Sequence, residues 1–350
     1  MKKKIKSNFF IFTFNSVIIL IVFLIIELIL RLKYNQTNSF NCYNQNEVLR
    51  NYTNGNNCYF IERYFEKKNE TLYITDNNGM RINKTSDKTS AKAIYFIGDS
   101  FTFGHLSNYQ ETYPYNSVNY INKTKNKELF IEKNLGVNGY QFRQNISLIK
   151  DISNNKKDSL IVYGLTPNDL FDLQEKEKVV TDYNNYSFLD WVKIKIDTSN
   201  LISIKFFSYL LLKNDNLYLA INQNRGDKAG FVNKSSSNFW EKKYRIFKRE
   251  INGLQKETRD RLIITIIPQQ IQIRLLKKGL RLDALSFDKN ILQICKQIKI
   301  TCFSLTEELA TNTNYKTHYT LDGHLLPEAN REYGKILGKH LLKNMHKIQW

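Results

Sequence analysis

The sequence predicts an α/β protein with a central parallel β-sheet and helices on both faces of that sheet, preceded by a transmembrane helix. Three observations lead to this prediction. Apolar, β-branched segments recur along the later part of the 350-residue chain, and amphipathic segments alternate with them. Apolar runs without a polar face are typical of strands buried on both sides, as in parallel sheets. A long apolar segment also lies near the N-terminus.

The N-terminal segment is long and apolar enough to cross a bilayer. Its 22 residues from Phe9 to Leu30 contain one ionisable side chain, Glu27, and about 20 apolar residues span the hydrocarbon as a helix. No small-residue cleavage site follows the segment, which favours an uncleaved anchor over a signal peptide. Four lysines precede it and only Arg31 and Lys33 follow it closely. Residues 1–33 are therefore interpreted as a cytoplasmic tip and a single-pass anchor, with an extracytoplasmic remainder.

The net charge of the chain is +19, which raises the question of nucleic-acid binding. The lysines are scattered among asparagine, isoleucine and tyrosine residues, and no nucleic-acid-binding motif accompanies them. The expected topology also places the main domain away from cytoplasmic nucleic acid. We therefore predict no nucleic-acid partner, and a basic surface that attracts anionic polymers or lipid head groups.

The four cysteines suit an oxidising compartment. Cys42 and Cys58 lie in the polar stretch after the anchor, and Cys295 and Cys302 lie near the C-terminus. An even number of cysteines outside the cytoplasm suggests two local disulfides, Cys42–Cys58 and Cys295–Cys302. A metal site is less favoured because neither pair has CxxC spacing.

Residues 34–90 read as a polar N-terminal extension that packs on the main domain. Short strands are expected at 58–65 and 71–75, and an Asn-Gly turn follows in "DNNGMRIN". Residues 91–345 then form the main domain. Its expected strands lie at 93–98, 129–136, 159–164, 261–268 and 298–305, and its expected helices at 113–123, 141–154, 288–298 and 327–345.

One connection in the main domain is much longer than a single crossover needs. About ninety residues separate the third and fourth expected strands. The segment is aromatic and basic, and we interpret about 171–258 as a helical insert of two or three helices that forms a lid or side wall. The apolar stretch 201–212 is too short to be a second membrane span.

Polar residues follow the expected strands where parallel strands end at a common edge. Ser100 lies in "GDS", Gly139 in "NLGVNG" and Asn168 in "YGLTPND", while Asp322 and His324 lie in "LDGH". A hydroxyl, a glycine amide, a carboxamide, an acid and an imidazole are the groups that acyl transfer requires. Each residue alone is more often a helix cap or a turn residue. The four motifs together favour the catalytic interpretation.

These motifs resemble those of the SGNH or GDSL hydrolases, particularly the membrane-anchored bacterial members. The resemblance covers about residues 74–342 and rests on "FIGDSFTFG", "NLGVNGYQFRQN", "IVYGLTPNDL" and "YTLDGHLLPEANR" in the family's order. "DNNGMRIN" is also similar to the lead-in of such proteins. The resemblance implies a flavodoxin-like three-layer sandwich. It further implies a Ser-His-Asp site and an oxyanion hole with three donors: the backbone N–H groups of Ser100 and Gly139 and the side-chain amide of Asn168.

In this interpretation Ser100 is the nucleophile, His324 removes its proton, and Asp322 orients and stabilises the imidazolium. The sequence departs from the family at the last motif, since one residue instead of two separates Asp322 from His324. A metal site formed by His318, Asp322 and His324 is a weaker alternative. The remaining histidines, His105, His340 and His346, are interpreted as surface or packing residues, and Asp99 as a residue that bonds local backbone.

The sequence thus predicts a membrane-anchored, extracytoplasmic serine esterase or O-acyltransferase. Its expected substrate is an ester-bearing surface glycan or lipid, with O-acetyl groups favoured, and neither a cofactor nor a metal is expected. The alternative is a non-catalytic envelope protein that keeps the fold and holds anionic polymer. Hydrolysis and transfer share the acyl-enzyme and differ in whether water or an alcohol attacks it.

Overall fold

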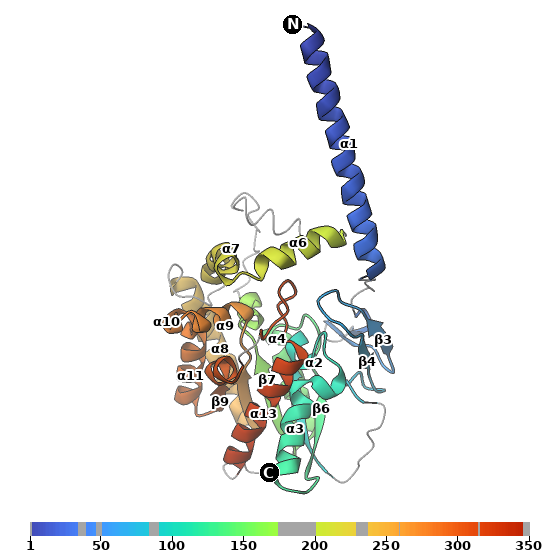
Figure 1. The fold of residues 1–350 in the computed structure, drawn as a ribbon. Coiled ribbons are helices and arrows are strands. Elements are labelled where there is room, and N and C mark those ends of the chain that lie inside the picture. The colour runs from blue at the N-terminus through green and yellow to red at the C-terminus, as the bar shows by residue number, and fades with distance from the viewer. Residues whose placement is uncertain are drawn as a thin grey trace.

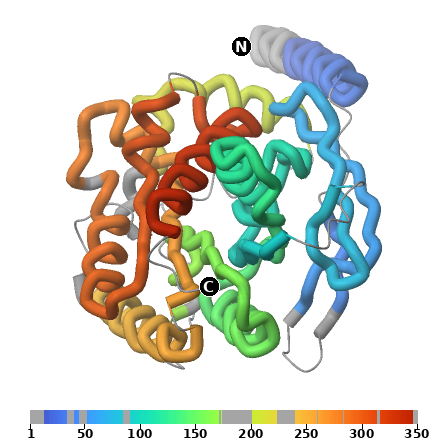
Figure 2. Tube along the Cα trace, turned by 90° about the horizontal axis from the view of Figure 1, so that it is seen from below, coloured from blue at the N-terminus to red at the C-terminus, as the bar shows by residue number. Residues whose placement is uncertain are grey.

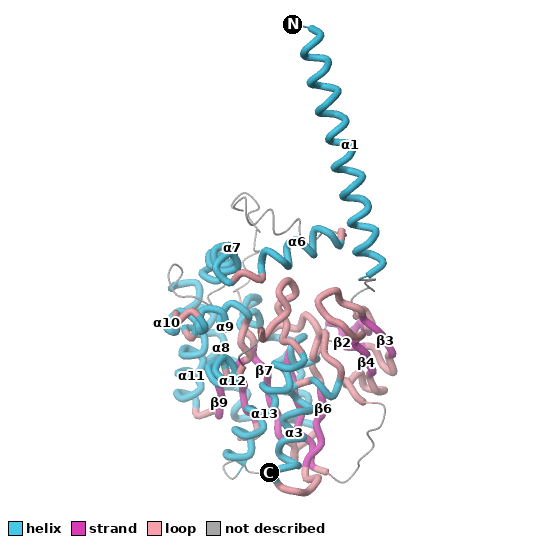
Figure 3. Tube along the Cα trace, viewed as in Figure 1, coloured by secondary structure: helices cyan, strands magenta, loops and turns pink. Residues whose placement is uncertain are grey.

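A five-stranded parallel sheet forms the centre of the computed structural model, which describes residues 2–33, 40–46, 51–83, 91–173, 201–228, 237–258, 260–313 and 316–345 (Figures 1 and 3). The strands are β5 (Lys92–Gly98), β6 (Phe130–Asn134), β7 (Leu160–Leu165), β8 (Leu262–Ile266) and β9 (Thr301–Ser304). Their order in the sheet is β6-β5-β7-β8-β9. All five expected strands are present at the expected places.

The strand order confirms the predicted flavodoxin-like α/β fold. Numbered along the chain, the order is 2-1-3-4-5, and every neighbouring pair is parallel. Every residue of β7 and of β8 is buried, which explains why these strands are apolar on both faces. In such sheets the direction of winding reverses beside the first strand, and ligands bind there, outside the carboxyl ends of the strands.

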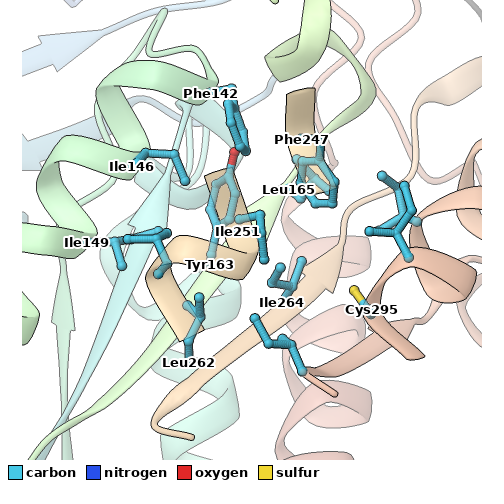
Figure 4. Packing of buried hydrophobic residues seen from close by; sticks show 14 of the residues in the cluster. Phe142, Ile146, Ile149, Tyr163, Leu165, Phe247, Ile251, Leu262, Ile264 and Cys295 are labelled. Atoms are coloured by element: carbon cyan, nitrogen blue, oxygen red, sulfur yellow. The ribbon is translucent and has the colours of Figure 1, made fainter. Parts of the chain in front are cut away.

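Helices cover both faces of the sheet. One face carries α4 (Phe142–Asn155), α8 (Ser237–Thr258) and α11 (Ser286–Ile298), whose apolar residues pack on the strands in the cluster of Figure 4. The other face carries α3 (Tyr113–Thr124), α9 (Gln270–Lys277), α12 (Thr306–Asn312) and α13 (Pro327–Asn344). The four helices expected from periodicity are α3, α4, α11 and α13.

The long connection between β7 and β8 contains helices of two kinds. Helix α8 packs on the same face of the sheet as α4, through the buried residues Phe247, Ile251 and Leu254. It is therefore the crossover helix that a parallel connection requires. The additional helices are α6 (Ile202–Leu212) and α7 (Asp215–Lys228). Residues 174–200 and 229–236 of the expected insert lie outside the described residues.

Several short elements complete the fold. The "GDS" motif leads into the four-residue helix α2 (Ser100–Phe103), and α10 (Arg281–Ala284) joins α9 to α11. Two 3₁₀ turns, η1 (Tyr109–Glu111) and η2 (Pro167–Asp172), follow α2 and β7. A helix after Ser100 and a turn after Pro167 were expected from the sequence. The elements η1 and α10 were not, because three or four residues carry too little periodicity to recognise.

The N-terminal extension forms two small antiparallel hairpins. One joins β1 (Tyr43–Asn46) to β2 (Asn51–Asn54), and the other joins β3 (Tyr59–Glu62) to β4 (Thr71–Ile74). The second hairpin matches the two strands expected from the sequence, whereas the first was not expected. Disulfides link Cys42 to Cys58 and Cys295 to Cys302. The first of these bonds connects the two hairpins.

A long N-terminal helix, α1 (Lys2–Lys33), extends away from the rest of the molecule (Figures 1 and 2). Its segment Thr13–Lys33 has a mean hydropathy of 2.7 and is long and apolar enough to cross a membrane. Glu27, expected to reach toward the aqueous interface, is instead buried against the start of α6, where its carboxylate accepts hydrogen bonds from the backbone N–H groups of Ile202 and Ser203.

Arg81 explains why the "DNNGMRIN" lead-in precedes the sheet. Its buried guanidinium donates to the backbone carbonyls of Phe103, the last residue of α2, and of Gly104 and Ser107, which follow that helix. The guanidinium carbon also lies 4.7 Å from the centre of the Tyr73 ring. One planar cation thus satisfies the carbonyls at the end of the helix that begins with Ser100.

We expect Arg81→Ala to destabilise the fold markedly. The substitution leaves buried carbonyls without donors, and each buried unsatisfied polar group costs about 1–3 kcal/mol. A loss of about 3 kcal/mol in the free energy of unfolding, measured by urea denaturation of the region after α1, is the expected result. Arg63→Ala is the matched control, because Arg63 forms an exposed ion pair with Glu70, and such pairs contribute about 0–1 kcal/mol. Equal free energies of unfolding of the two variants would contradict the stabilising role of Arg81.

Candidate active site

Ser100 lies at the sharp turn between β5 and α2. Asp99 caps α2 through its side chain, which accepts a hydrogen bond from the backbone N–H of Phe101 at 2.9 Å. Gly98 ends β5, and a Cβ there would lie 2.1 Å from the side-chain oxygen of Thr102. The glycine therefore allows the helix to start directly against the strand. This turn presents Ser100 at the carboxyl edge of the sheet.

Asp322 and His324 lie on a closed loop before α13. The loop is held by backbone hydrogen bonds from Leu326 to Thr317 and from Tyr319 to His324. Between the two site residues, Gly323 has a φ of +86°, a left-handed conformation that glycine adopts readily. This turn lets the Asp322 carboxylate accept hydrogen bonds from both the backbone and the ring of His324. The short Asp-x-His spacing therefore brings acid and imidazole together.

The structure joins Ser100, His324 and Asp322 in one hydrogen-bonded chain, although 224 residues separate the serine from the histidine. His324 Nδ1 lies 2.6 Å from Asp322 Oδ1, and His324 Nε2 lies 2.6 Å from Ser100 Oγ. An ionised carboxylate only accepts, so the proton resides on Nδ1. Nε2 of the neutral ring is then an acceptor for the serine hydroxyl.

The electrostatics of the pair favour this arrangement. Burial opposes the charge on His324, but the Asp322 carboxylate outweighs that effect and raises the pKa of His324 above its ordinary value. Burial likewise acts to raise the pKa of Asp322, but His324, together with the weaker influence of His105, holds that pKa well below its usual range. Asp322 is therefore a carboxylate at neutral pH, and His324 is a stronger base than a free imidazole.

His105 is a neighbour of the site that the sequence interpretation missed. Its ring centre lies 4.8 Å from that of His324, and its Nε2 lies 3.7 Å from Asp322 Oδ2. Burial lowers the pKa of His105 to about 4, so the ring is neutral at pH 7. The signal was available in the sequence, because His105 directly follows "GDSFTFG", and its backbone N–H bonds to the carbonyl of Ser100.

Asn168 is held beside the turn that contains Asp99 and Ser100. Its side-chain amide donates to Asp99 Oδ2 at 3.2 Å, and its carbonyl oxygen accepts from Gln269 Nε2 at 2.8 Å. The two bonds fix which end of the amide faces the turn. The sequence interpretation of Asp99 was that it bonds local backbone, and its bond to the N–H of Phe101 agrees with this. Asp99 also accepts hydrogen bonds from the side chains of Asn168 and Thr166.

Gly139 lies in the loop that follows β6. Val137 of this loop donates its backbone N–H to the carbonyl of Gly98 at 3.0 Å, which places the loop beside the turn between β5 and α2. Gly139 has a φ of +78°, and a Cβ there would lie 2.5 Å from the hydroxyl of Tyr52. Both the backbone conformation and the close approach of Tyr52 therefore require glycine. No interaction among the described residues joins Gly139 directly to Ser100.

Both ring nitrogens of His318 have partners other than Asp322 and His324, the other two members of the metal alternative. Its ring is buried, with Nε2 3.0 Å from the Pro268 carbonyl and Nδ1 2.8 Å from the hydroxyl of Thr317. Within the part of the chain that the structure describes, His105, Asp322 and His324 bring acidic and imidazole ligand atoms within 4.8 Å of one another. This cluster contains two of the predicted catalytic residues.

Glu66, from the N-terminal extension, holds the loop that carries the acid and the imidazole. Its carboxylate accepts from the backbone N–H groups of Thr320 and Leu321 at 2.8 and 2.9 Å. It also pairs with Lys316 at 2.9 Å. The position of Glu66 carries no motif, and its partners lie about 250 residues away in the sequence, so sequence reasoning had no signal for it.

Comparison with known proteins gives matches among solved structures alone. No family model matches the chain, and neither does any characterised protein in the sequence comparison. The chain is similar to a lipolytic protein of the G-D-S-L family from Veillonella parvula, with 11% identity, 74% of this chain and 100% of that chain covered, and a TM-score of 0.40. A lipase/acylhydrolase from Enterococcus faecalis matches at 10% identity over 74% of this chain and 97% of its own, with a TM-score of 0.39.

A two-domain esterase active on acetylated mannans, crystallised with mannopentaose, also matches. The identity is 12%, the match covers 73% of this chain and 50% of that chain, and the TM-score is 0.40. Likenesses of this degree do not establish an activity.

We expect the three described histidines of this region to titrate far apart. His324 should titrate above the ordinary histidine range, whereas His105 and His318, whose pKa values burial lowers to about 4 and about 3, should stay neutral down to acidic pH. Histidine-selective NMR over a pH series measures all three values. Asp322→Asn should lower the pKa of His324, because the carboxylate that stabilises the imidazolium is lost. His340→Gln is the control and should leave the pKa of His324 unchanged. An unchanged pKa of His324 in Asp322→Asn would contradict the hydrogen-bonded pair of Asp322 and His324.

Proposed function

We propose that this protein is a membrane-anchored serine esterase or O-acyltransferase that works through an acyl-enzyme at Ser100. The observation that carries the proposal is the continuous chain of hydrogen bonds from Ser100 through His324 to Asp322. A serine hydroxyl is a weak nucleophile until a neighbouring base removes its proton. The raised pKa of His324 gives that base its strength.

Acylation follows from the geometry. Ser100 Oγ attacks the ester carbonyl while His324 Nε2 takes the hydroxyl proton, and the Asp322 carboxylate stabilises the imidazolium. The tetrahedral intermediate collapses when His324 returns the proton to the departing alkoxide, which leaves as an alcohol. The acyl group remains on Ser100. His105 is neutral at pH 7. It therefore adds no second positive charge beside the Asp322 carboxylate.

The oxyanion of the intermediate needs donors that are already in place. We assign this role to the backbone N–H of Ser100, at the start of α2, the N–H of Gly139 and the amide of Asn168. The amide has two N–H groups, and the bond of one to Asp99 fixes its orientation. We assign the second N–H to the oxyanion. Ser100 and Asn168 follow β5 and β7, the adjacent strands at which the winding of the sheet reverses.

The second half of the reaction decides between hydrolysis and transfer. Water attacking the acyl-enzyme yields an acid, whereas a sugar or lipid hydroxyl yields a new ester, and His324 activates either nucleophile in the same way. We propose O-acetyl groups of a surface glycan or lipid as the substrate class, because α1 holds the site near a membrane. The proposed topology places the N-terminus in the cytoplasm and the site on the opposite side.

The alternative is a non-catalytic protein that uses its basic surface to hold anionic envelope polymer. The net charge of +19 favours polymer binding. A chain that binds polymer in a salt-sensitive way, yet fails to acylate Ser100 under any condition in which it is folded, would favour this alternative.

Labelling by a fluorophosphonate probe tests the proposal. The full chain in detergent should be labelled once, at Ser100, because the hydrogen-bonded base activates that hydroxyl. Ser100→Ala should abolish labelling, and Ser304→Ala, on β9, is the matched control that should retain it. Absence of labelling in folded wild-type protein would contradict the proposed function.

Asn168→Ala should slow ester cleavage with little effect on substrate binding. Losing one oxyanion donor reduces the rate by about a hundred- to a thousandfold. The expected result is therefore a fall in kcat toward p-nitrophenyl acetate of that order with a nearly unchanged KM. Asn155→Ala, an exposed position at the end of α4, should leave kcat unchanged. A wild-type kcat in Asn168→Ala would show that this amide does not stabilise the oxyanion.

A further inference from the structure

The short helix α6 (Ile202–Leu212) exposes an apolar face. The side chains of Phe207, Leu210 and Leu211 are 48%, 46% and 60% exposed, and their spacing of three and four residues places them on one side of the helix. Leu217 at the start of α7 is exposed as well. Contiguous exposed apolar side chains of this kind mark a binding or membrane-contacting surface.

The opposite side of α6 is fixed to the main domain. Ile202 and Ser208 are buried. The ring of Tyr209 lies 5.8 Å from that of Phe65, and Lys316 Nζ lies 5.2 Å from the Tyr209 ring centre. One side of α6 therefore packs on protein and the other side is exposed, although apolar residues lie nearly all round the helix.

Glu27 ties the start of α6 to α1. Its carboxylate, 6% exposed, accepts hydrogen bonds from the backbone N–H groups of Ile202 and Ser203 at 3.1 and 2.8 Å, and from Arg31 Nε at 2.7 Å. These N–H groups belong to the first turn of α6 and have no partner within that helix. The acidic side chain in the apolar segment therefore caps a second helix, and Figure 1 shows α6 running crosswise beside the lower end of α1.

The position of Glu27 sets the level of α6 relative to a bilayer. Glu27 lies about 11 Å along the helix axis from the midpoint of the apolar run Phe9–Leu30, at about 1.5 Å per residue. Half the hydrocarbon thickness is about 15 Å. The cap therefore lies about 4 Å inside the hydrocarbon edge when α1 stands upright. Interfacial helices lie at this boundary, with their apolar faces about 5–10 Å deep.

We propose that α6 is an interfacial helix that lies in the outer surface of the membrane crossed by α1. Phe207, Leu210 and Leu211 enter the acyl region, and the Glu27 cap fixes the angle between the two helices. Lys213, exposed at the end of α6, places its ammonium 4.5 Å from the Tyr209 ring centre, on the side of the helix away from this apolar face. The inference rests on the proposed anchoring of the chain, since it takes the level of the membrane from α1.

This placement orients the candidate active site. Lys316, which contacts Tyr209 of α6, begins the segment that carries Asp322 and His324, and Glu66 bonds both Lys316 and that segment. Figure 1 shows the loop before α13 directed toward α6. The carboxyl edge of the sheet therefore faces the lipid surface. Esters within reach of Ser100 are those displayed at that surface, on a lipid or on a polymer held close to it.

Spin labels on single introduced cysteines test the inference on the full chain in vesicles of phosphatidylcholine and phosphatidylglycerol. All four native cysteines are in disulfides, so an introduced thiol is labelled selectively. Labels replace Leu210 on α6, Ile19 on α1 and Lys127 in the exposed turn before β6. Accessibility to oxygen and to a water-soluble nickel complex then reports the depth of each label. We expect Ile19 to be deep in lipid, Leu210 at a shallow depth in the acyl region just below the head groups, and Lys127 in water.

Each other outcome is distinguishable. Ile19 in lipid with Leu210 in water would overturn the inference and leave the anchored enzyme intact. Ile19 in water would overturn the proposed anchoring, and the inference with it. A Leu210 label shielded from both reagents would show that protein covers the face, either another segment or a second copy, and would also overturn the inference.

A kinetic comparison adds a second readout. Phe207→Ser with Leu211→Ser should raise KM at least severalfold for an ester embedded in the same vesicles, while kcat/KM for soluble p-nitrophenyl acetate stays unchanged. Leu282→Ser, an exposed leucine on α10, is the matched control and should change neither. Equal KM values in the double variant and the control would contradict a role of α6 at the lipid surface.

Discussion

The candidate active site depends on one geometric constraint. Parallel strands run in the same direction, so their carboxyl ends all lie at the same edge of the sheet. This constraint brings the turn after β5 beside the turn after β7, and the loop before α13 meets them there. Only then does the ring of His324 lie between Ser100 and Asp322 with both contacts at 2.6 Å. The hydrogen-bonded chain is local in space but spans most of the main domain in sequence.

The N-terminal extension supports this site from outside the sheet. Arg81 satisfies the carbonyls that follow α2, and Glu66 holds the loop of Asp322 and His324. Tyr52 packs against Gly139 and donates to the neighbouring Asn138 carbonyl at 2.7 Å. Three residues outside the sheet thus position three different parts of the candidate site. Rigid support of this kind keeps a catalytic constellation within the narrow geometry it needs.

The sequence predicted what depends on local pattern and missed what depends on long-range packing. The strands and four main helices carried clear periodicity, and "GDS" and "LDGH" marked the residues that the structure joins. His105 was interpreted as a packing or surface residue because no motif named it, yet it contacts His324. Glu27 was expected to face the interface, because nothing in the sequence links it to α6, 175 residues away. Such pairings depend on tertiary structure, which periodicity does not encode.

Trapping the acyl-enzyme tests the central claim most directly. The full chain is mixed with p-nitrophenyl acetate, quenched in acid within the first turnover, and digested for mass spectrometry. The account predicts one acetyl group, on the peptide that contains Ser100, and loss of that adduct in His324→Ala, which lacks the base. An acetyl group on any other residue, or ester cleavage that proceeds at the wild-type rate in His324→Ala, would contradict it.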